Sequence, residues 1–353
     1  MKEAVLYEKG EGKKVRCTAC RHYCLIPDKG TGICGVRQNI DGKLYLIVYG
    51  KASAVNIDPV EKKPLFHFLP GTPIFSLGTV GCNFACDFCQ NWDLSQATKD
   101  LRAKLVKEKR AEDMGIEVGK FGYELLPEKI VEITAEKKIP SIAYTYNEPI
   151  IFFEYLYDTA KLATKKGIKN VLVTNGYETD EALEKLKPYV QALNIDIKSF
   201  SSEFYTTVCK ARLEKVLETI KAAKKLSFWV ELTTLVIPGK NDSEGELQKI
   251  AKFIASVDKN MPWHVTAFFP QYKMTDVKAT PASALEKAYN IGKKAGLNYV
   301  YVGNIADDEH SNTCCHNCNA LLIKREGYFV EVQDCFKSGK CQNCGTKIPG
   351  VWK

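Results

Sequence analysis

The chain has 353 residues, enough for one large domain with small appendages, and it carries 14 cysteines and a formal charge of +8. It contains no run near the roughly 18 apolar residues that span a membrane, and its first residues lack the apolar core of a signal peptide. We therefore expect a soluble cytoplasmic protein whose cysteines bind metals, because disulfide frameworks belong to short secreted chains.

The positive charge alone would favour a nucleic-acid partner. The formal count treats every thiol as neutral, however, and all the cysteines except Cys209 fall into three groups with metal-ligand spacing. Two four-thiolate zinc sites and one three-thiolate iron-sulfur site would lower the net charge to roughly +3. We therefore expect neither nucleic acid nor a membrane as a partner.

The first module, residues 1–50, contains four cysteines spaced C-x2-C-x3-C-x9-C: Cys17, Cys20, Cys24 and Cys34. Four thiolates this close in sequence suit a zinc ion or a second iron-sulfur cluster, because C-x2-C pairs are half-sites of both. Zinc is the preferred assignment. His22 lies inside this loop, where we expect it to support a sulfur ligand rather than replace one.

Residues 51–73 are predicted to form a connector, and residues 74–305 a parallel β/α domain in which apolar runs alternate with helical patterns. Such units fit a partial or full TIM-type (β/α) barrel, whose active site lies at the C-terminal ends of the strands. Thr280 is expected to cap a helix that starts at Pro281. Residues 102–123 are predicted to be an exposed insertion, a lid or a solvated loop. The expected strands are 74–80, 141–145, 170–174, 192–196, 229–236, 264–268 and 299–302.

Directly after the first expected strand comes a C-x3-C-x2-C loop formed by Cys82, Cys86 and Cys89. Three protein ligands on a four-iron cubane leave one iron open, which favours chemistry at the cluster over simple electron storage. A zinc loop lacking one ligand and three unconnected buried thiols are the alternatives.

This loop resembles the signature of the radical S-adenosylmethionine (radical SAM) superfamily, C-x3-C-x-aromatic-C, with Phe88 at the aromatic position. The resemblance implies a [4Fe-4S] cluster on the three cysteines and SAM bound to the fourth iron through its amino and carboxylate groups. One electron would then cleave SAM to a 5'-deoxyadenosyl radical, which takes a hydrogen atom from a substrate.

Further cofactor contacts are implied by segments that resemble the superfamily and its pyruvate formate-lyase activating enzymes. Glu148 matches the acid of a Gly-Gly-Glu-type motif that binds the SAM amino group, although Tyr146 and Asn147 replace the glycines. Capping of the next helix is the alternative role of Glu148. Thr174 and Asn175 match a Thr-Asn-Gly motif, which by itself is only a turn.

Later strand ends supply the remaining candidates. Asp196 and Lys198 match an Asp-x-Lys that reaches SAM in those enzymes, with an ordinary ion pair as the alternative. His264 matches a segment of the adenosine pocket, although a lone histidine is more often a satisfied core residue. Cys209 is a candidate catalytic residue, with a buried apolar role as the alternative.

The C-terminal module, residues 312–353, contains two C-x2-C pairs, Cys315 with Cys318 and Cys341 with Cys344. Such pairs about twenty residues apart predict a zinc ribbon, which a tail of this length needs in order to fold. Cys314 and Cys335 are spare thiols that would allow other ligand sets, and rubredoxin-type iron is the alternative metal.

Taken together, these segments resemble the radical SAM member of the AmmeMemoRadiSam system over nearly the whole chain. The resemblance implies SAM, an electron donor such as ferredoxin or flavodoxin, and either a protein substrate or the partner proteins of that system. It does not identify the substrate. The alternatives are a glycyl-radical-enzyme activating enzyme and a nonenzymatic zinc-ribbon adaptor that binds protein or RNA.

Overall fold

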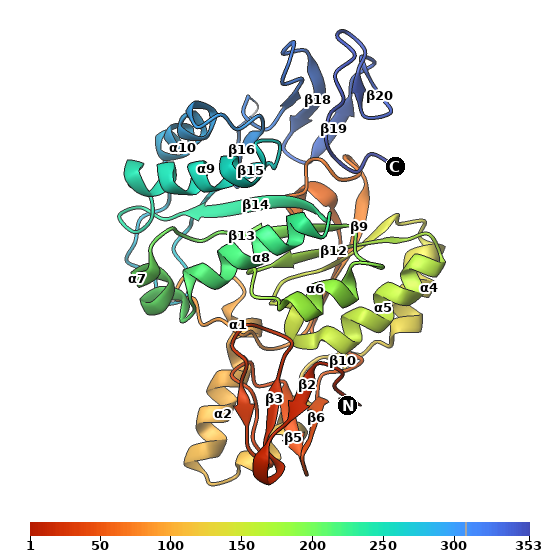
Figure 1. Cartoon of the computed structure of the whole chain (residues 1–353), viewed down its shortest axis with the longest axis vertical. Coiled ribbons are helices and arrows are strands. Elements are labelled where there is room, and N and C mark those ends of the chain that lie inside the picture. The colour runs from red at the N-terminus through yellow and green to blue at the C-terminus, as the bar shows by residue number, and fades with distance from the viewer. Residues whose placement is uncertain (308) are drawn as a thin grey trace. The chain divides into compact units, whose positions relative to one another are not determined.

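The computed structural model describes residues 1–307 and 309–353, and the chain forms two compact units (Figure 1). The first unit comprises residues 1–57, 74–191 and 215–228, and the second comprises residues 58–73, 192–214 and 229–353. No helix of the described residues is both long enough and apolar enough to cross a membrane.

The N-terminal part of the first unit consists of short antiparallel strands. Two three-stranded sheets have the orders β2-β3-β4 and β1-β6-β5, and β7 pairs with β10. The segment predicted as a connector contributes β7, β8 and the 3-10 helix η2. The elements are β1 (Lys2–Glu3), β2 (Tyr7–Lys9), η1 (Glu11–Lys13), β3 (Val15–Cys17), β4 (Leu25–Ile26), β5 (Arg37–Ile40), β6 (Lys43–Leu46), β7 (Lys51–Ala52), β8 (Ala54–Pro59) and β10 (Tyr123–Glu124), while η2 (Val60–Lys62) belongs to the second unit.

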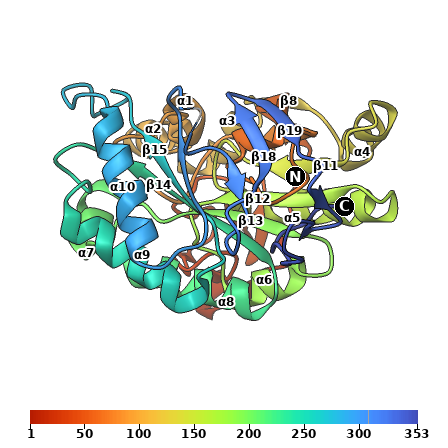
Figure 2. The ribbon, with the colours of Figure 1, turned by 90° about the horizontal axis from the view of Figure 1, so that it is seen from above.

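Parallel strands form the centre of the first unit. Strand β11 pairs in parallel with β9 on one side and β12 on the other. Their residues are almost all buried, as expected for a sheet covered on both faces. Helix α5 packs against β12 (Figure 2). The elements are β9 (Pro73–Gly78), α4 (Pro127–Glu136), β11 (Ser141–Tyr144), η4 (Pro149–Phe152), α5 (Phe153–Lys165), β12 (Lys169–Thr174), α6 (Asp180–Leu186) and α8 (Leu213–Lys225).

The segment after the cysteine loop is helical, so the prediction of a solvated loop there is wrong. It contains α1 (Trp92–Ser95), α2 (Ala97–Lys107), η3 (Ala111–Asp113) and α3 (Met114–Val118). Leu105, Met114 and Val118 are buried, which shows that this segment covers apolar surface despite its many charges. It also binds the N-terminal module, because Arg102 donates to the carbonyl oxygen of Gly32 at 3.2 Å.

The second unit contains the other parallel strands, in the order β13-β14-β15-β16. Helix α10 packs against β15, β16 and α9 (Figure 1). Pro281 rather than Thr280 is the N-cap of α10, so that capping prediction is wrong; the Thr280 hydroxyl donates instead to Val236 O at 2.6 Å. The elements are β13 (Ala192–Asp196), α7 (Ser202–Phe204), the π-helix η5 (Tyr205–Cys209), β14 (Trp229–Val236), α9 (Glu244–Asp258), β15 (Trp263–Ala267), α10 (Ala282–Lys294) and β16 (Val300–Gly303).

The C-terminal module of the second unit is built from two short antiparallel sheets. The elements of the module are β17 (Thr313–Cys314), β18 (Leu321–Glu326), β19 (Phe329–Val332), β20 (Phe336–Lys337) and β21 (Lys340–Cys341).

The seven parallel strands predicted from the sequence are all present within two residues of their expected ends, so the parallel β/α architecture is confirmed.

Gly81 is a position where the fold requires glycine. Its φ of +94° lies in a region that L side chains rarely adopt, and a Cβ there would come within 2.8 Å of the Cys34 backbone oxygen. Gly167 also has a positive φ, +74°, but nothing lies within 4 Å of its Cβ position. The two glycines therefore separate backbone strain from a steric clash.

We predict that Gly167→Ala lowers the free energy of unfolding by about 1 kcal/mol through backbone strain alone. Gly81→Ala should cost about 3 kcal/mol, because the clash with the Cys34 carbonyl adds to the strain. Urea denaturation of the two variants and the unsubstituted protein, all without metal, measures the difference. Equal losses would show that the approach of Cys34 to Gly81 does not constrain the fold.

Candidate functional site

The cysteine loop between β9 and α1 is held at its start by Asn147. The Asn147 amide donates to Gly81 O at 2.7 Å and accepts from Thr79 N at 3.2 Å. The sequence analysis gave Asn147 no contact of its own and noted it as a departure from a glycine motif, yet its side chain ties the end of β11 to the residue before Cys82. The neighbouring Tyr146 has a φ of +71°, so it adopts the conformation that a glycine would favour.

The three loop cysteines lie in a largely buried environment. Cys82 and Cys86 are buried, and Cys89 is partly exposed with its sulfur 3.1 Å from Ser95 Oγ. Burial raises the pKa of the Cys82 thiol to about 12. Iron loading must therefore displace a proton from this thiol, which makes it more favourable at higher pH.

Lys99 supplies a positive charge beside this loop. Its ammonium group donates to Phe84 O, within the loop, and to Gln96 Oε1 at 2.8 Å. Burial lowers the Lys99 pKa, while the thiols of Cys82 and Cys86 act in the opposite direction. Sequence reasoning missed this residue because α2 was not predicted, and a lysine in a charged segment carries no other signal.

Glu148 is buried directly after the first turn that follows β11. Its carboxylate caps η4 by accepting from Ile150 N at 3.0 Å, and it also accepts from Thr174 Oγ1 at 3.0 Å and from Asn175 N at 2.8 Å. The structure therefore brings together Glu148, Thr174 and Asn175, three of the residues that the resemblance assigns to the cofactor. The capping role is observed, and the contact with SAM stays a prediction.

A second buried carboxylate, Glu178, lies near Glu148 and was missed by sequence reasoning. It is 0% exposed, and within residues 1–307 and 309–353 neither of its oxygens has a hydrogen-bond partner. Burial, followed by the charge of Glu178, raises the pKa of Glu148 well above its usual value, and burial also raises the pKa of Glu178. The pair therefore favours a state in which one carboxyl keeps its proton.

Two asparagine side chains meet beside Cys82. Asn175 Nδ2 donates to Asn83 Oδ1 at 2.7 Å and lies 4.0 Å from Cys82 Sγ. In the described part of the chain, Asn83 Nδ2 and Asn175 Oδ1 are buried without a hydrogen-bond partner. Buried polar atoms in folded proteins are nearly always paired, so these two atoms indicate a place for a polar ligand.

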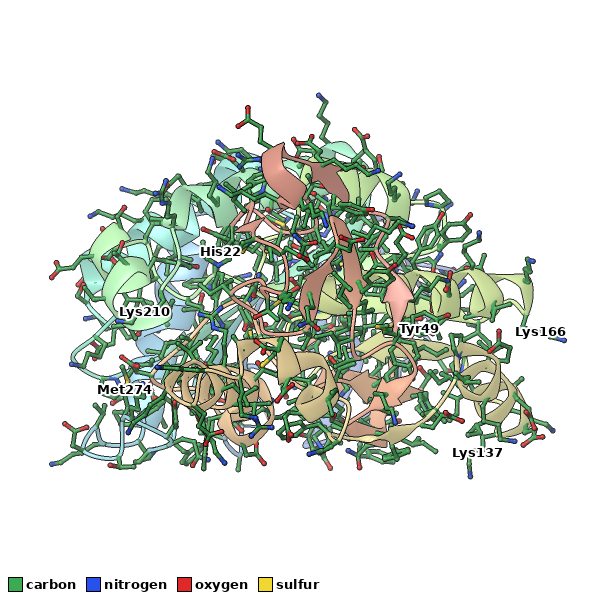
Figure 3. The ribbon with its side chains drawn as sticks, turned by 90° about the horizontal axis from the view of Figure 1, so that it is seen from below. His22, Tyr49, Lys137, Lys166, Lys210 and Met274 are labelled. Carbon is green, nitrogen blue, oxygen red and sulfur yellow. The ribbon has the colours of Figure 1, made fainter. Side chains whose placement is uncertain are left out.

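The N-terminal cysteines lie in the same unit as this loop. Cys17 and Cys24 are adjacent, because Cys17 N donates to Cys24 O at 3.0 Å, and burial raises the pKa of Cys34 to about 12. His22, which lies beside the N-terminal strands (Figure 3), is 3.1 Å from Asn83 O through Nε2. The predicted metal on these cysteines remains a prediction, whereas His22 is seen to contact the cysteine loop.

In the second unit, the candidate cofactor residues form the ordinary ion pair and the core histidine contact that were given as alternatives. Lys198 Nζ forms a 2.7 Å ion pair with Asp196 Oδ2, and His264 Nε2 lies 2.7 Å from Glu231 Oε2 in the core. Cys209 is 0% exposed at the end of η5. Their roles toward SAM or a substrate stay predictions.

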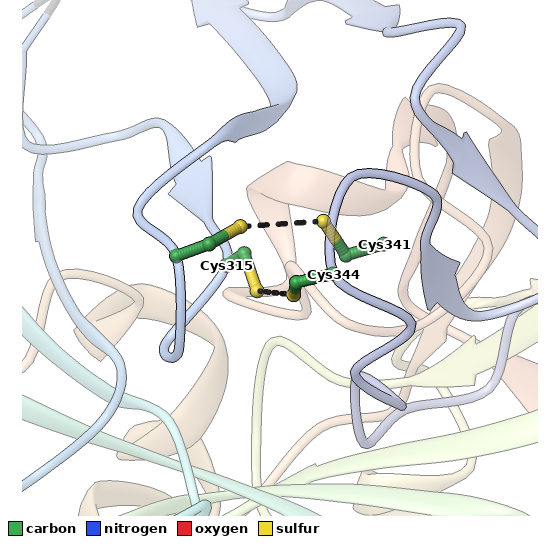
Figure 4. A group of neighbouring side chains, drawn as sticks. Cys315, Cys341 and Cys344 are labelled. Carbon is green, nitrogen blue, oxygen red and sulfur yellow. Dashed lines mark hydrogen bonds between the residues drawn. The ribbon is translucent and has the colours of Figure 1, made fainter.

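The C-terminal cysteines converge on one point (Figure 4). The sulfurs of Cys315, Cys318, Cys341 and Cys344 all lie within 4.8 Å of one another, and two of the S···S distances are 3.6 Å. This spacing suits four thiolates around a single tetrahedral ion. Of the spare thiols, Cys335 instead donates to Leu321 O at 3.1 Å.

The C-terminal module is packed onto the rest of its unit through a buried polar network. His67 lies between Pro349 O, 2.7 Å from Nδ1, and Tyr301 Oη, 2.6 Å from Nε2. Burial lowers the pKa of His67 to about 4. The neutral imidazole therefore donates to Pro349 and accepts from Tyr301, and the rings of Trp229, Tyr299 and Trp352 lie against it.

Comparison with known proteins supplies independent findings. The sequence profile of the radical SAM superfamily matches residues 76–254. An uncharacterised protein of Methanocaldococcus jannaschii is 44% identical over 351 residues, 99% of each chain. A GTP 3',8-cyclase of Aquifex aeolicus is 28% identical and covers 65% of this chain and 78% of its own. A pyruvate formate-lyase-activating enzyme of Clostridium pasteurianum is 22% identical and covers 59% and 82%.

The sulfur geometry predicts which cysteines hold the C-terminal metal. Cys318→Ser should lose the bound ion and unfold the module, because a small module depends on its metal for folding energy. Cys335→Ser, the matched control, should keep the zinc content of the unsubstituted protein, whereas Cys318→Ser should contain about one zinc fewer. Metal analysis after gel filtration measures both, and a zinc content of Cys318→Ser equal to that of the unsubstituted protein would contradict this ligand set.

The His67 network predicts a pH dependence of stability. Because the pKa of His67 is about 4 in the folded chain and about 6.5 when unfolded, only the unfolded chain takes up this proton between those values. The free energy of unfolding therefore falls by about 3 kcal/mol as the pH drops from 6.5 to 4. His67→Gln keeps a donor and an acceptor but does not titrate, so the stability difference between the two proteins should change by this amount. If the free energies of unfolding of the two proteins differ by the same amount at every pH from 6.5 to 4, the low pKa of His67 is refuted.

Proposed function

Because the chain belongs to the radical SAM superfamily, we propose that it reductively cleaves SAM and takes a hydrogen atom from a substrate that is not yet identified. The observation that carries this proposal is the C-x3-C-x2-C loop, which Asn147 and Gly81 fix at the end of β9. A [4Fe-4S] cluster with SAM supplies one-electron cleavage to a 5'-deoxyadenosyl radical and methionine. The donor set fits such a cluster, because it offers three thiolates.

The roles of the chain's own residues follow from their chemistry. Cys82, Cys86 and Cys89 would hold the iron, and the ammonium group of Lys99 would offset part of the negative charge of their thiolates. The Glu148 carboxylate would attract the SAM ammonium group, and Thr174 and Asn175 keep that carboxylate in place. We assign Phe88, Asp196, Lys198 and His264 to the cofactor on the resemblance described above, and Cys209 to the substrate.

The finer assignment is the radical SAM member of the AmmeMemoRadiSam system, acting in the cytoplasm with a ferredoxin or flavodoxin as electron donor. Zinc in the C-terminal module, and zinc or a second iron-sulfur cluster in the N-terminal module, complete this assignment. The tight convergence of the C-terminal sulfurs supports zinc there.

A second candidate is activation of a glycyl-radical enzyme. It is favoured by the similarity to a pyruvate formate-lyase-activating enzyme. This activity would require a large protein substrate with an exposed glycine loop. Radical transfer to such a protein, seen as a glycyl-radical EPR signal that depends on SAM, would favour this candidate over the first.

The proposal predicts that anaerobically reconstituted protein, incubated with SAM and dithionite, forms 5'-deoxyadenosine and methionine. Cys86→Ala should form neither above background, because loss of one of three thiolates prevents assembly of the cluster. Chromatographic quantification of both products measures this. Product formation that is equal in the two proteins, or absent from both, would refute the proposed function.

A further inference from the structure

Helices α1 and α2 pack against the cysteine loop. On their inner side, Ser95 Oγ lies 3.1 Å from Cys89 Sγ, and the Lys99 ammonium group donates to Phe84 O. Cys89 is also the partly exposed member of the three loop cysteines, whereas the other two are buried. A helix with its side chains is about 10 Å across, so the outer side of α1 and α2 is about one helix width from the loop.

This outer side holds a large share of the positive charge of the chain. Residues 97–110 contain six lysines and arginines and two acidic residues, a net charge of +4, which is half of the formal +8 of all 353 residues. Lys99 and Arg102 are turned to the loop and to the N-terminal module. The other four basic residues are exposed: Lys104, Lys107, Lys109 and Arg110.

The acidic groups near this surface are held by one of these residues. The guanidinium group of Arg110 contacts three carboxylates at 3.3, 2.8 and 3.7 Å: those of Glu108, Asp113 and Glu117. Within residues 1–307 and 309–353, the three exposed lysines of the segment form no ion pair. The surface therefore keeps its positive charge in the folded chain.

The place and the charge of this surface indicate what binds there. The proposed chemistry requires one electron at the cluster, and electron tunnelling slows steeply with distance, so the donor has to dock close to the cysteine loop. Electron-transfer partners form small transient interfaces in which complementary charge guides the encounter. RNA fits less well, because its binding rests on many phosphate contacts and several stacked bases, whereas this surface offers three lysines and the 41% exposed ring of Trp92.

We propose that the outer side of α1 and α2, marked by Lys104, Lys107 and Lys109, is the docking surface for an acidic protein that carries single electrons. This inference rests on the proposed function and gives its electron a point of entry. In the encounter, one electron leaves the reduced carrier and enters the cluster, so the carrier is oxidised and the cluster is reduced by one electron. No bond forms or breaks in this step.

Charge reversal on this surface tests the inference. Lys104→Glu combined with Lys107→Glu should lower the second-order rate constant for reduction of the reconstituted cluster by flavodoxin hydroquinone at least about tenfold at low salt, because attraction becomes repulsion. The difference should shrink as salt is added, since salt screens exposed charges. Stopped-flow absorbance of the cluster measures the rate in the absence of SAM, so no turnover is involved.

The matched control is Lys165→Glu combined with Lys166→Glu at the end of α5, which lies apart from α2 in the same unit (Figure 1). Both pairs of lysines lie at the C-terminal end of a helix, so both variants lose the same favourable charges there. Flavodoxin should reduce the control as fast as the unsubstituted protein. Photoreduced 5-deazariboflavin, a small uncharged donor, should reduce all three proteins equally fast.

Several results would overturn the inference. One is reduction by flavodoxin at equal rates in the two double variants. Another is slower reduction of the α2 variant by 5-deazariboflavin as well, because the defect would then lie at the cluster. A third is tighter binding of a mixed-sequence RNA oligonucleotide than of flavodoxin, lost in the α2 variant, which would identify RNA as the partner.

Two further points keep the test decisive. If the α2 double variant assembles no cluster, Lys107→Glu alone serves in its place, with slower reduction by flavodoxin again expected and an unchanged rate again contradicting the inference. If the unsubstituted protein assembles no reducible cluster, the proposed function falls and this inference falls with it. If every variant is reduced equally by both donors and cleaves SAM, only this inference is overturned.

Discussion

The hydrogen bonds of the Asn147 side chain to Gly81 and Thr79 are the constraint on which the candidate site depends. They join the end of β11 to the start of the cysteine loop, so the loop is fixed by the sheet rather than by its own sequence. Gly81 completes the constraint, because its conformation lets the chain pass against the Cys34 carbonyl. A loop that binds a reactive cluster benefits from such rigidity, because its ligands are then already in position before the metal binds.

The groups around this loop follow one electrostatic pattern. Buried thiols and carboxylates are destabilised as anions, and the chain supplies only partial compensation through Lys99 and backbone N–H donors. The unpaired atoms of Glu178, Asn83 and Asn175 belong to the same region of the first unit. A ligand with a sulfonium cation, an ammonium group and a carboxylate would complete this set, because the cations suit the buried carboxyl groups and the carboxylate can accept from the Asn83 amide.

Much of the fold could be predicted because its signals are local. The apolar run 229–236 predicted a strand, and β14 has these bounds. The helical spacing of Leu213, Val216 and Ile220 predicted a helix, and these residues lie in α8. The helices of residues 97–118 were missed because their buried residues are few and charges dominate the segment. The cysteine groups were identified from spacing alone, and the C-terminal quartet was confirmed as one convergent set.

The contacts that complete the site could not be predicted in the same way. Asn147 and Glu178 are single polar residues whose importance depends on neighbours that are distant in sequence. Asn147, for example, accepts a hydrogen bond from Thr79, which lies about 70 residues before it. The spacing of cysteines can be read directly from the sequence, whereas the hydrogen bond between one amide and a distant carbonyl depends on how the chain packs. His264 is a residue for which the motif resemblance suggested a cofactor contact, whereas the structure shows a hydrogen bond to Glu231 in the core.

The central claim is that SAM binds the open iron of a cluster on Cys82, Cys86 and Cys89. Electron-nuclear double resonance of the reduced cluster tests it directly, with SAM labelled by nitrogen-15 in the amino group and oxygen-17 in the carboxylate. The account predicts hyperfine coupling of both labels to the cluster. A spectrum without either coupling, from protein shown by dialysis to have bound SAM, would contradict it.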